Sequence, residues 1–143
     1  MKPLTGTYSP SMDTKGRMAF PAKLREQLGA GFVVTVDIGV EGYLCVYSTA
    51  EFEKVVDRLS SVTGPAARQA VRRVMSGSEY PDCDKQGRIQ IGQKLREYAG
   101  LDHDITVIGN RDHAEIWDTA RYEAQNAKFS DEELAAALDG IAF

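Results

Sequence analysis

Residues 13–29 read DTKGRMAFPAKLREQLG, and residues 84–100 read DKQGRIQIGQKLREYAG. Eight of the 17 aligned positions are identical, whereas ordinary residue usage would give about one match. The shared residues are Asp, Gly and Arg, then the run Lys-Leu-Arg-Glu, and a final Gly. Because similarity at a fixed spacing marks an internal repeat, we predict that the chain contains two copies of one structural unit.

The similarity continues beyond these segments. The same offset aligns Val34–Val36 with Ile105–Val107, and both stretches are apolar and β-branched. We expect the first repeat to span residues 7–54 and the second to span residues 83–126. Residues 127–143 are expected to form an acidic C-terminal helix or tail.

Each repeat is predicted to open with a β-hairpin whose tip is basic. In the first copy, residues 8–12 and 17–20 have the composition of short strands, and Gly16 in the turn between them can take a positive φ. The second copy should form the same hairpin over residues 80–91. The two tips would therefore present equivalent side chains.

The remainder of each repeat is predicted to be a short helix, two apolar strands and a further helix. Apolar runs and Gly or Pro punctuation indicate these elements. The expected elements are helix 21–28, strands 32–36 and 43–47, a helix capped by Ser48, a linking helix 66–75, helix 93–99, strands 105–108 and 114–117, a helix after Asp118, and a tail helix begun by Ser130 with Glu133 at its third position.

The fold class follows from the size of the repeat. A unit of about 70 residues with two hairpins leaves strand edges exposed and buries little apolar surface by itself. We therefore expect the two copies to complete each other's sheet as one intertwined β-barrel with helices around it. The predicted class is α+β, mainly β.

The charge of the chain is unevenly distributed. The net charge of −4 argues mildly against a nucleic-acid partner, because affinity for phosphate comes mostly from clustered Lys and Arg. However, residues 1–25 contain five basic residues and one acidic residue, whereas residues 129–143 contain four acidic residues and no basic one. This asymmetry indicates one face for an anionic partner and another end kept away from it.

The tips carry the residues that could contact DNA. A hairpin presents Lys15 and Arg17 outward, and an arginine can bind phosphate or guanine edges through two parallel hydrogen bonds. Asp13 would hold Arg17 in a fixed pose. The alternative is a polar turn with a satisfied Asp–Arg pair, but its recurrence favours a shared use and leaves open whether both copies bind. The predicted DNA-binding residues are Asp13, Lys15 and Arg17 in the first copy and Asp84, Lys85 and Arg88 in the second.

A second basic group lies on the linking helix. Arg68, Arg72 and Arg73 occur in a stretch without acidic residues between Pro65 and Ser78. These arginines could make a further anionic contact, form a solvated helix face or contact another subunit.

Other functional classes have little support. The N-terminus lacks a secretory signal and no run of residues is apolar enough for a membrane helix, so we expect a cytoplasmic protein without a membrane partner. Cys45 and Cys83 have no zinc-like spacing and are expected to be reduced thiols. Neither they nor His103 and His113 fall in a catalytic constellation, so we expect no enzyme activity, cofactor or small-molecule substrate.

The same residues closely resemble the MraZ family of bacterial transcriptional regulators, and the resemblance covers nearly the whole chain. It rests on the two D-x-x-x-R tips and on the LREYAGL segment at residues 95–101. The resemblance implies an AbrB-like swapped-hairpin barrel formed within one chain, assembly into rings, and binding of double-stranded DNA at promoter direct repeats.

The resemblance also assigns a role. It implies a nucleoid-associated regulator that usually represses its own division and cell-wall gene cluster. By position, Arg17 and Asp13 take the DNA-contacting role, with Arg88 and Asp84 as counterparts. The alternative is a ring-forming structural protein that binds a protein partner through its basic face.

Two positions depart from the family pattern. Gly92 stands where the first repeat has Pro21, which should weaken the start of the following helix. Gln90 replaces a typically apolar residue, so the second hairpin should be more exposed or face a neighbour. Both differences affect packing and subunit contacts more than the tips.

Overall fold

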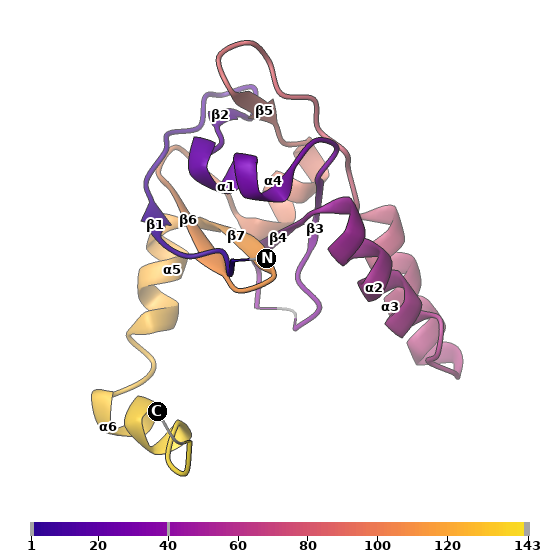
Figure 1. Cartoon of the computed structure of the whole chain (residues 1–143), viewed down its shortest axis with the longest axis vertical. Coiled ribbons are helices and arrows are strands. Elements are labelled where there is room, and N and C mark those ends of the chain that lie inside the picture. The colour runs from indigo at the N-terminus through magenta and orange to yellow at the C-terminus, as the bar shows by residue number, and fades with distance from the viewer. Residues whose placement is uncertain (1, 40, 142–143) are drawn as a thin grey trace.

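The computed structural model describes residues 2–39 and 41–141. A body of short strands carries the α2–α3 helical hairpin on one side and the C-terminal helices on the other (Figure 1). The elements in chain order are β1 (Thr7–Tyr8), β2 (Arg17–Ala19), α1 (Ala22–Leu28), β3 (Val33–Val36), β4 (Leu44–Tyr47), α2 (Thr49–Leu59), α3 (Pro65–Ser76), β5 (Arg88–Gln90), α4 (Gln93–Ala99), β6 (Ile105–Asn110), β7 (His113–Asp118), α5 (Thr119–Asn126) and α6 (Asp131–Ala137).

Both sheets combine strands from the two repeats. The larger sheet has the order β1-β6-β7-β4-β3, and β2 pairs with β5 in a separate two-stranded ribbon. The pairs β1–β6, β4–β7 and β2–β5 each join a strand of the first repeat to a strand of the second, and all are antiparallel. The expectation that the two copies complete each other's sheet is confirmed in a mixed α/β fold.

The predicted hairpins at the two tips are largely wrong, whereas the later strands of each repeat do pair locally, β3 with β4 and β6 with β7. In the first copy only one bridge, between Met12 and Met18, joins the two sides of the tip, and β1 pairs with β6 instead. In the second copy no strand precedes β5 among the described residues of the tip. The physical reason is that Met18 and Ile89 lie opposite each other in the β2–β5 ribbon and are both buried, each 1% exposed. Pairing across the repeats places both apolar side chains in the core.

The helix boundaries agree with the sequence prediction apart from small shifts. Ser48 accepts a hydrogen bond from the Glu51 amide, as the capping box predicted, and Ser130 forms the predicted box with Glu133. Pro21 is the N-cap of α1 rather than its first helical residue. The prediction of the cap positions therefore needs correction only at α1.

The expected weakness at Gly92 is offset by a tertiary contact. The Gly92 amide donates a hydrogen bond of 3.0 Å to the carboxylate of Glu79, at the start of α4. A proline at this position has no amide hydrogen to donate. A carboxylate at a helix N-terminus also interacts favourably with the helix dipole.

One core lies beneath the ribbon and draws on both repeats. Its largest fully buried side chains include equivalent pairs from the two copies. Members of this cluster are Met18, Phe20, Leu24, Leu44, Val46, Ile89, Ile91, Leu95, Ile105 and Ile116. The ribbon is therefore fixed on its inner face, while its outer face is free to carry charge.

Within the described residues, no helix is both long and apolar enough to cross a membrane.

Candidate nucleic-acid interface

The side chain of Asp13 organises the first tip. Its Oδ1 accepts the backbone amides of Lys15 and Arg17, both at 2.9 Å. Its Oδ2 accepts the Arg17 Nε, also at 2.9 Å. Gly16 has a φ of +82°, as the turn requires. The carboxylate thus fixes both the turn and the direction in which the guanidinium of Arg17 points.

The second tip has the same construction. Asp84 Oδ1 accepts the amides of Gln86 at 2.8 Å and Arg88 at 2.9 Å. Its Oδ2 accepts the Arg88 Nε at 2.9 Å, and Gly87 has a φ of +78°. The Asp–Arg pairing predicted at both tips is therefore present.

Both tip carboxylates are stabilised in the ionised form. The backbone amide of Arg17 has the largest effect in lowering the pKa of Asp13, helped by the Arg17 side chain and the Lys15 amide. The Arg88 amide lowers the pKa of Asp84 in the same way. Hydrogen bonds to a carboxylate favour its charged form. Each tip therefore keeps a charged ion pair at neutral pH.

The ion pairs leave part of each guanidinium available. The side chains of Arg17 and Arg88 are each 41% exposed. In residues 2–39 and 41–141, the terminal Nη atoms of both arginines make no hydrogen bond, because Asp13 and Asp84 engage the Nε atoms. The Nη atoms of each arginine can consequently donate two hydrogen bonds to a ligand outside the ribbon.

The two arginines lie on one face of the ribbon. Arg17 is paired with Gln90, and Ala19 is paired with Arg88. Side chains of directly paired residues point to the same face of a sheet, and successive residues alternate. Because Met18 points into the core, all four of these residues belong to the outer face. Figure 1 shows this ribbon at one extreme end of the molecule.

Two further arginines support the tips, and the prediction missed them. Arg96 on α4 donates from Nε to the backbone oxygen of Ile91 at 2.9 Å. A Cβ added to Gly16 would lie 2.6 Å from that same Nε. Arg25 Nη1 on α1 lies still closer to a Cβ added to Gly87, so each helix arginine contacts the tip of the other repeat. Both arginines occupy the same position of the repeated Lys-Leu-Arg-Glu run, and this repetition could have indicated their shared role.

Gln90 is exposed, as expected from its polarity, and it contacts the first tip. Its Nε2 donates to the backbone oxygen of Lys15 at 2.9 Å. The pseudo-equivalent position in the first repeat is Ala19, which has no side chain able to make this bond. The hydrogen bond from Gln90 to the first tip therefore has no counterpart from Ala19 at the second tip.

The six predicted DNA-binding residues come together at one end of the fold, but other basic residues do not join them. Lys15 and Lys85 are both exposed, and they occupy non-equivalent positions in their tips. The arginines of α3 belong to the α2–α3 hairpin, which lies away from the β2–β5 ribbon (Figure 1). The site is thus confined to the tips and the adjoining helices.

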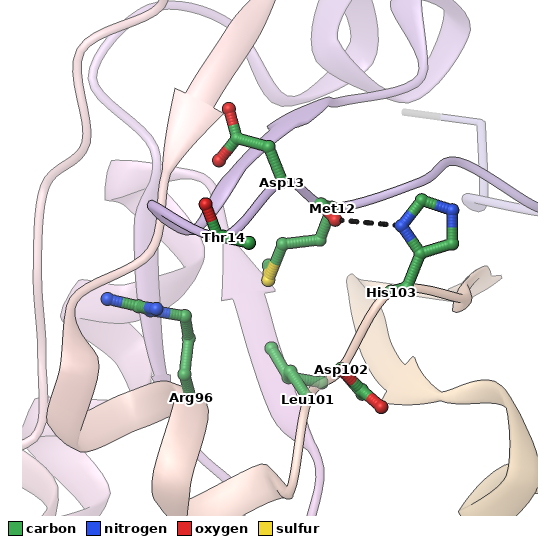
Figure 2. Close-up of a pocket in the computed structure, with 7 residues that line it drawn as sticks. All are labelled: Met12, Asp13, Thr14, Arg96, Leu101, Asp102 and His103. Carbon is green, nitrogen blue, oxygen red and sulfur yellow. Dashed lines mark hydrogen bonds between the residues drawn. The ribbon is translucent and has the colours of Figure 1, made fainter.

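A groove of about 510 Å³ lies beside the first tip (Figure 2). His103 Nδ1 lies 3.2 Å from the backbone oxygen of Met12, while the Asp13 carboxylate points away from the groove. Its lining residues are Met12, Asp13, Thr14, Arg96, Leu101, Asp102 and His103. Arg96 thereby forms part of both the groove and the support of the tip.

Of the candidate nucleophiles and ligands, Cys45 and His113 lie apart from this site, whereas Cys83 directly precedes Asp84 and His103 lines the groove. Cys45 is buried, and burial raises the pKa of its thiol to about 12. Cys83 is an exposed free thiol. In the described part of the chain, no group of three or more His, Cys, Asp or Glu side chains is arranged so that it could hold a metal ion.

His113 belongs to a buried polar cluster at the β6–β7 turn. Its ring nitrogens lie 2.8 Å from Asp112 and 3.1 Å from Glu115. Glu115 also accepts hydrogen bonds from Trp117 and Asn110. Burial alone would lower the pKa of His113, but the hydrogen bonds to the two carboxylates outweigh it and raise the pKa. The two carboxylates therefore favour the protonated form of His113.

Comparison with known proteins agrees with the repeat. The model of the "MraZ protein" family matches residues 4–73 and again residues 74–140. The transcriptional regulator MraZ of Micrococcus luteus is 42% identical over 132 residues, covering 91% of this chain and 89% of the relative. That of Salinispora tropica is 42% identical over 139 residues, covering 95% of each chain. The resemblance drawn from the two tips is confirmed: the chain belongs to the MraZ family, a family of transcriptional regulators and not of enzymes.

Proposed function

We propose that the protein is a sequence-specific DNA-binding transcriptional regulator that contacts DNA with the outer face of the β2–β5 ribbon. The observation that carries this proposal is the pair of arginines, Arg17 and Arg88, pinned in the same pose on one exposed face. A two-stranded ribbon fits the major groove of B-DNA, where a bidentate arginine recognises guanine. The names of the curated relatives support the regulatory role.

The remaining basic residues have a complementary part in the proposal. Lys15 and Lys85 are exposed beside the arginines, and lysine contacts phosphate as a point charge. Arg25 and Arg96 hold the tips from below and add positive charge. Phosphate contacts orient a protein on DNA, whereas base contacts provide the specificity. Arg17 and Arg88 are therefore the proposed reading residues.

Assembly compensates for the acidic character of the whole chain. Two arginine contacts per subunit give weak binding, but linked subunits on repeated sites gain about 10²-fold or more in avidity. We accordingly propose a ring of identical chains bound to promoter direct repeats, which represses the protein's own division and cell-wall gene cluster. The place of action would be the nucleoid in the cytoplasm.

The proposal for the fold is an AbrB-like swapped-hairpin barrel built within one chain. The three strand pairs that join the repeats support it. The proposed division is repeat 1 over residues 7–54, repeat 2 over residues 83–126, and the acidic tail over residues 127–143. The two repeats would then act as one structural unit.

The test is fluorescence anisotropy on the protein's own upstream DNA and on a scrambled duplex, across a salt series. The double variant Arg17→Ala/Arg88→Ala should lose the preference for the upstream DNA. Arg58→Ala, which removes an exposed arginine from α2, is the matched control and should bind as the wild type does. The logarithm of the binding constant should fall by about 0.9 per phosphate contacted for each decade of salt.

The opposite result would decide against the proposal. Equal, weak binding of the wild type to both duplexes, at unchanged oligomeric mass, would exclude sequence-specific regulation through the ribbon. It would favour a ring-forming protein that binds a protein partner through its basic face.

A further inference from the structure

Helix α6 is a formed helix without a partner in the described chain. None of its residues is buried, and it extends away from the sheets (Figure 1). Leu134 and Leu138 are 51% and 52% exposed and lie one turn apart. Isolated helices shorter than about 12 residues are marginal in water. The apolar side of this seven-residue helix therefore calls for a surface that covers it.

Helix α3 offers a surface of opposite charge. Arg68 and Arg72 are exposed and lie one turn apart, and Met75 continues the same side of the helix with 39% exposure. Val62, just before α3, is 43% exposed. No acidic residue lies between Pro65 and Ser78. The exposed side of α3 thus combines two positive charges with apolar surface.

The two surfaces match in chemistry. Asp131, Glu132 and Glu133 occupy the first turn of α6 and Asp139 follows the helix, so the whole tail is acidic. An acidic helix with a leucine side and a basic helix with a methionine side can bury apolar area while their charges pair at the rim.

The structure separates α6 and α3 within one chain. Figure 1 shows α6 below the sheets on one side and the α2–α3 hairpin on the other. We propose that α6 of one copy docks on the exposed side of α3 of a second copy, through Leu134 and Leu138 against Met75 and with the tail carboxylates facing Arg68 and Arg72.

This contact joins two different surfaces of identical chains. Such a head-to-tail contact makes a ring when the rotation closes and an open chain when it does not. The inference rests on the proposed function, since it names the subunit contact of the proposed ring. It also gives the acidic tail a place away from the DNA-binding ribbon.

The test is light-scattering mass of the full chain over a range of concentration and salt. Leu134→Asp/Leu138→Asp, and separately Arg68→Glu/Arg72→Glu, should each lower the mass toward that of the single 15.7 kDa chain. Combining Arg68→Glu/Arg72→Glu with Glu132→Lys/Asp139→Lys should restore the assembly. Glu123→Lys, which changes an exposed acid on α5, is the matched control and should leave the mass unchanged.

Several outcomes would overturn the inference. These are an unchanged mass in the leucine and arginine variants, no recovery in the combined variant, or a monomeric wild type at every concentration. All substituted side chains are exposed, so equal urea midpoints should show that the variants remain folded.

DNA binding by the tips is tested separately. Arg17→Ala/Arg88→Ala should lose DNA preference and keep the wild-type mass. If the α6 and α3 variants keep their mass while the tip variant loses DNA, the docking inference fails and the proposed function stands. The reverse pattern, with the tip variant keeping its DNA preference, counts against the proposed function and leaves docking supported by the mass.

Discussion

The two tips of the ribbon share a scaffold and differ in what surrounds it. The carboxylates of Asp13 and Asp84 accept the same backbone amides and the same arginine Nε, at distances that agree within 0.1 Å. In contrast, Lys15 in the first tip corresponds to Gln86 in the second. Gln90 holds the first tip, and the second has no counterpart to this contact.

This difference shows which positions the fold requires. Asp, Gly and Arg make the turn and fix the guanidinium, so both copies need them. The two residues between Asp and Gly contribute to the turn mainly through their backbones, so their side chains are free to differ. One chain can therefore present the same arginine twice beside different neighbours, which suits an asymmetric DNA site.

The largest expected effect is a loss of DNA affinity that differs between substitution of Arg17 and substitution of Arg88. Arg17→Ala and Arg88→Ala should each lower affinity for the upstream DNA by about tenfold to a hundredfold, the range for loss of a bidentate base contact. The loss should be greater for Arg17→Ala, because Gln90 holds its tip in place. Anisotropy titrations at one salt concentration measure the difference. Full affinity in Arg88→Ala would mean that only the first tip reads DNA.

The next effect compares the two tip glycines. Both have positive φ, which costs a residue with a side chain about 1–2 kcal/mol. A Cβ on Gly16 would also lie 2.6 Å from the backbone oxygen of Ile91, whereas the nearest atoms to a Cβ on Gly87 belong to the flexible side chain of Arg25. We expect Gly16→Ala to lower the unfolding free energy by roughly 2–3 kcal/mol and Gly87→Ala by less. Urea denaturation measures both values. Equal losses of unfolding free energy would show that the backbone at Ile91 moves away from the added Cβ at little cost.

The comparison extends to the second turn of each repeat. Asp37 organises the β3–β4 turn by accepting the amides of Gly42 and Tyr43 at 3.1 and 3.2 Å. The β6–β7 turn instead depends on His113, which can lose its charge near neutral pH. The turn histidine of the second repeat should therefore make the unfolding free energy depend on pH, and the first repeat has no histidine in the equivalent turn.

The expected pH dependence follows from the raised pKa of His113. A raised pKa means that the stabilisation is fully present below the unfolded value of 6.5 and is lost as pH rises through the folded pKa. The lowered pKa of Glu115 adds stability above 4.5 that is lost in acid. The unfolding free energy should therefore fall as pH rises from below 6.5 through the folded pKa of His113. Chemical denaturation of wild type and His113→Gln measures this, and an equal slope in both would assign the effect elsewhere.

The smallest effect tests the extra contact of the first tip. Gln90→Ala removes the bond to the Lys15 carbonyl and should raise amide exchange in the first tip by about threefold, because an exposed hydrogen bond contributes little. The second tip should not change. Ala19→Gln is the matched variant, since it offers the second tip the missing side chain. Hydrogen exchange by NMR follows both tips. Identical exchange rates in the wild type, Gln90→Ala and Ala19→Gln would show that the Gln90 contact does not stabilise the tip.

The sequence predicted the features that depend on neighbouring residues. The Asp13–Arg17 and Asp84–Arg88 pairs and the caps at Ser48 and Ser130 all depend on residues within four positions of one another. Local hydrogen bonds of this kind leave a pattern of residue types that can be recognised without a structure.

The features that were missed depend on contacts between distant segments. Alternating apolar residues in β2 are compatible with any antiparallel partner, so the pattern could not show that β2 pairs with β5 instead of residues 8–12. The cap of α4 by Glu79 likewise comes from a residue 13 positions away. The roles of Arg25 and Arg96 became clear only when each was seen beside the tip of the other repeat.

The exchange of strands between repeats also sets the order in which the protein can fold during synthesis. Thr7 pairs with Ile108, so β1 has no partner until about 100 further residues have left the ribosome. A half-made chain carries unpaired strand edges of the kind that recruit other chains. Closure across such a sequence separation is also slow. The strand edges of the first half of the chain therefore stay unpaired until β6 and β7 have been synthesised and have joined the sheet.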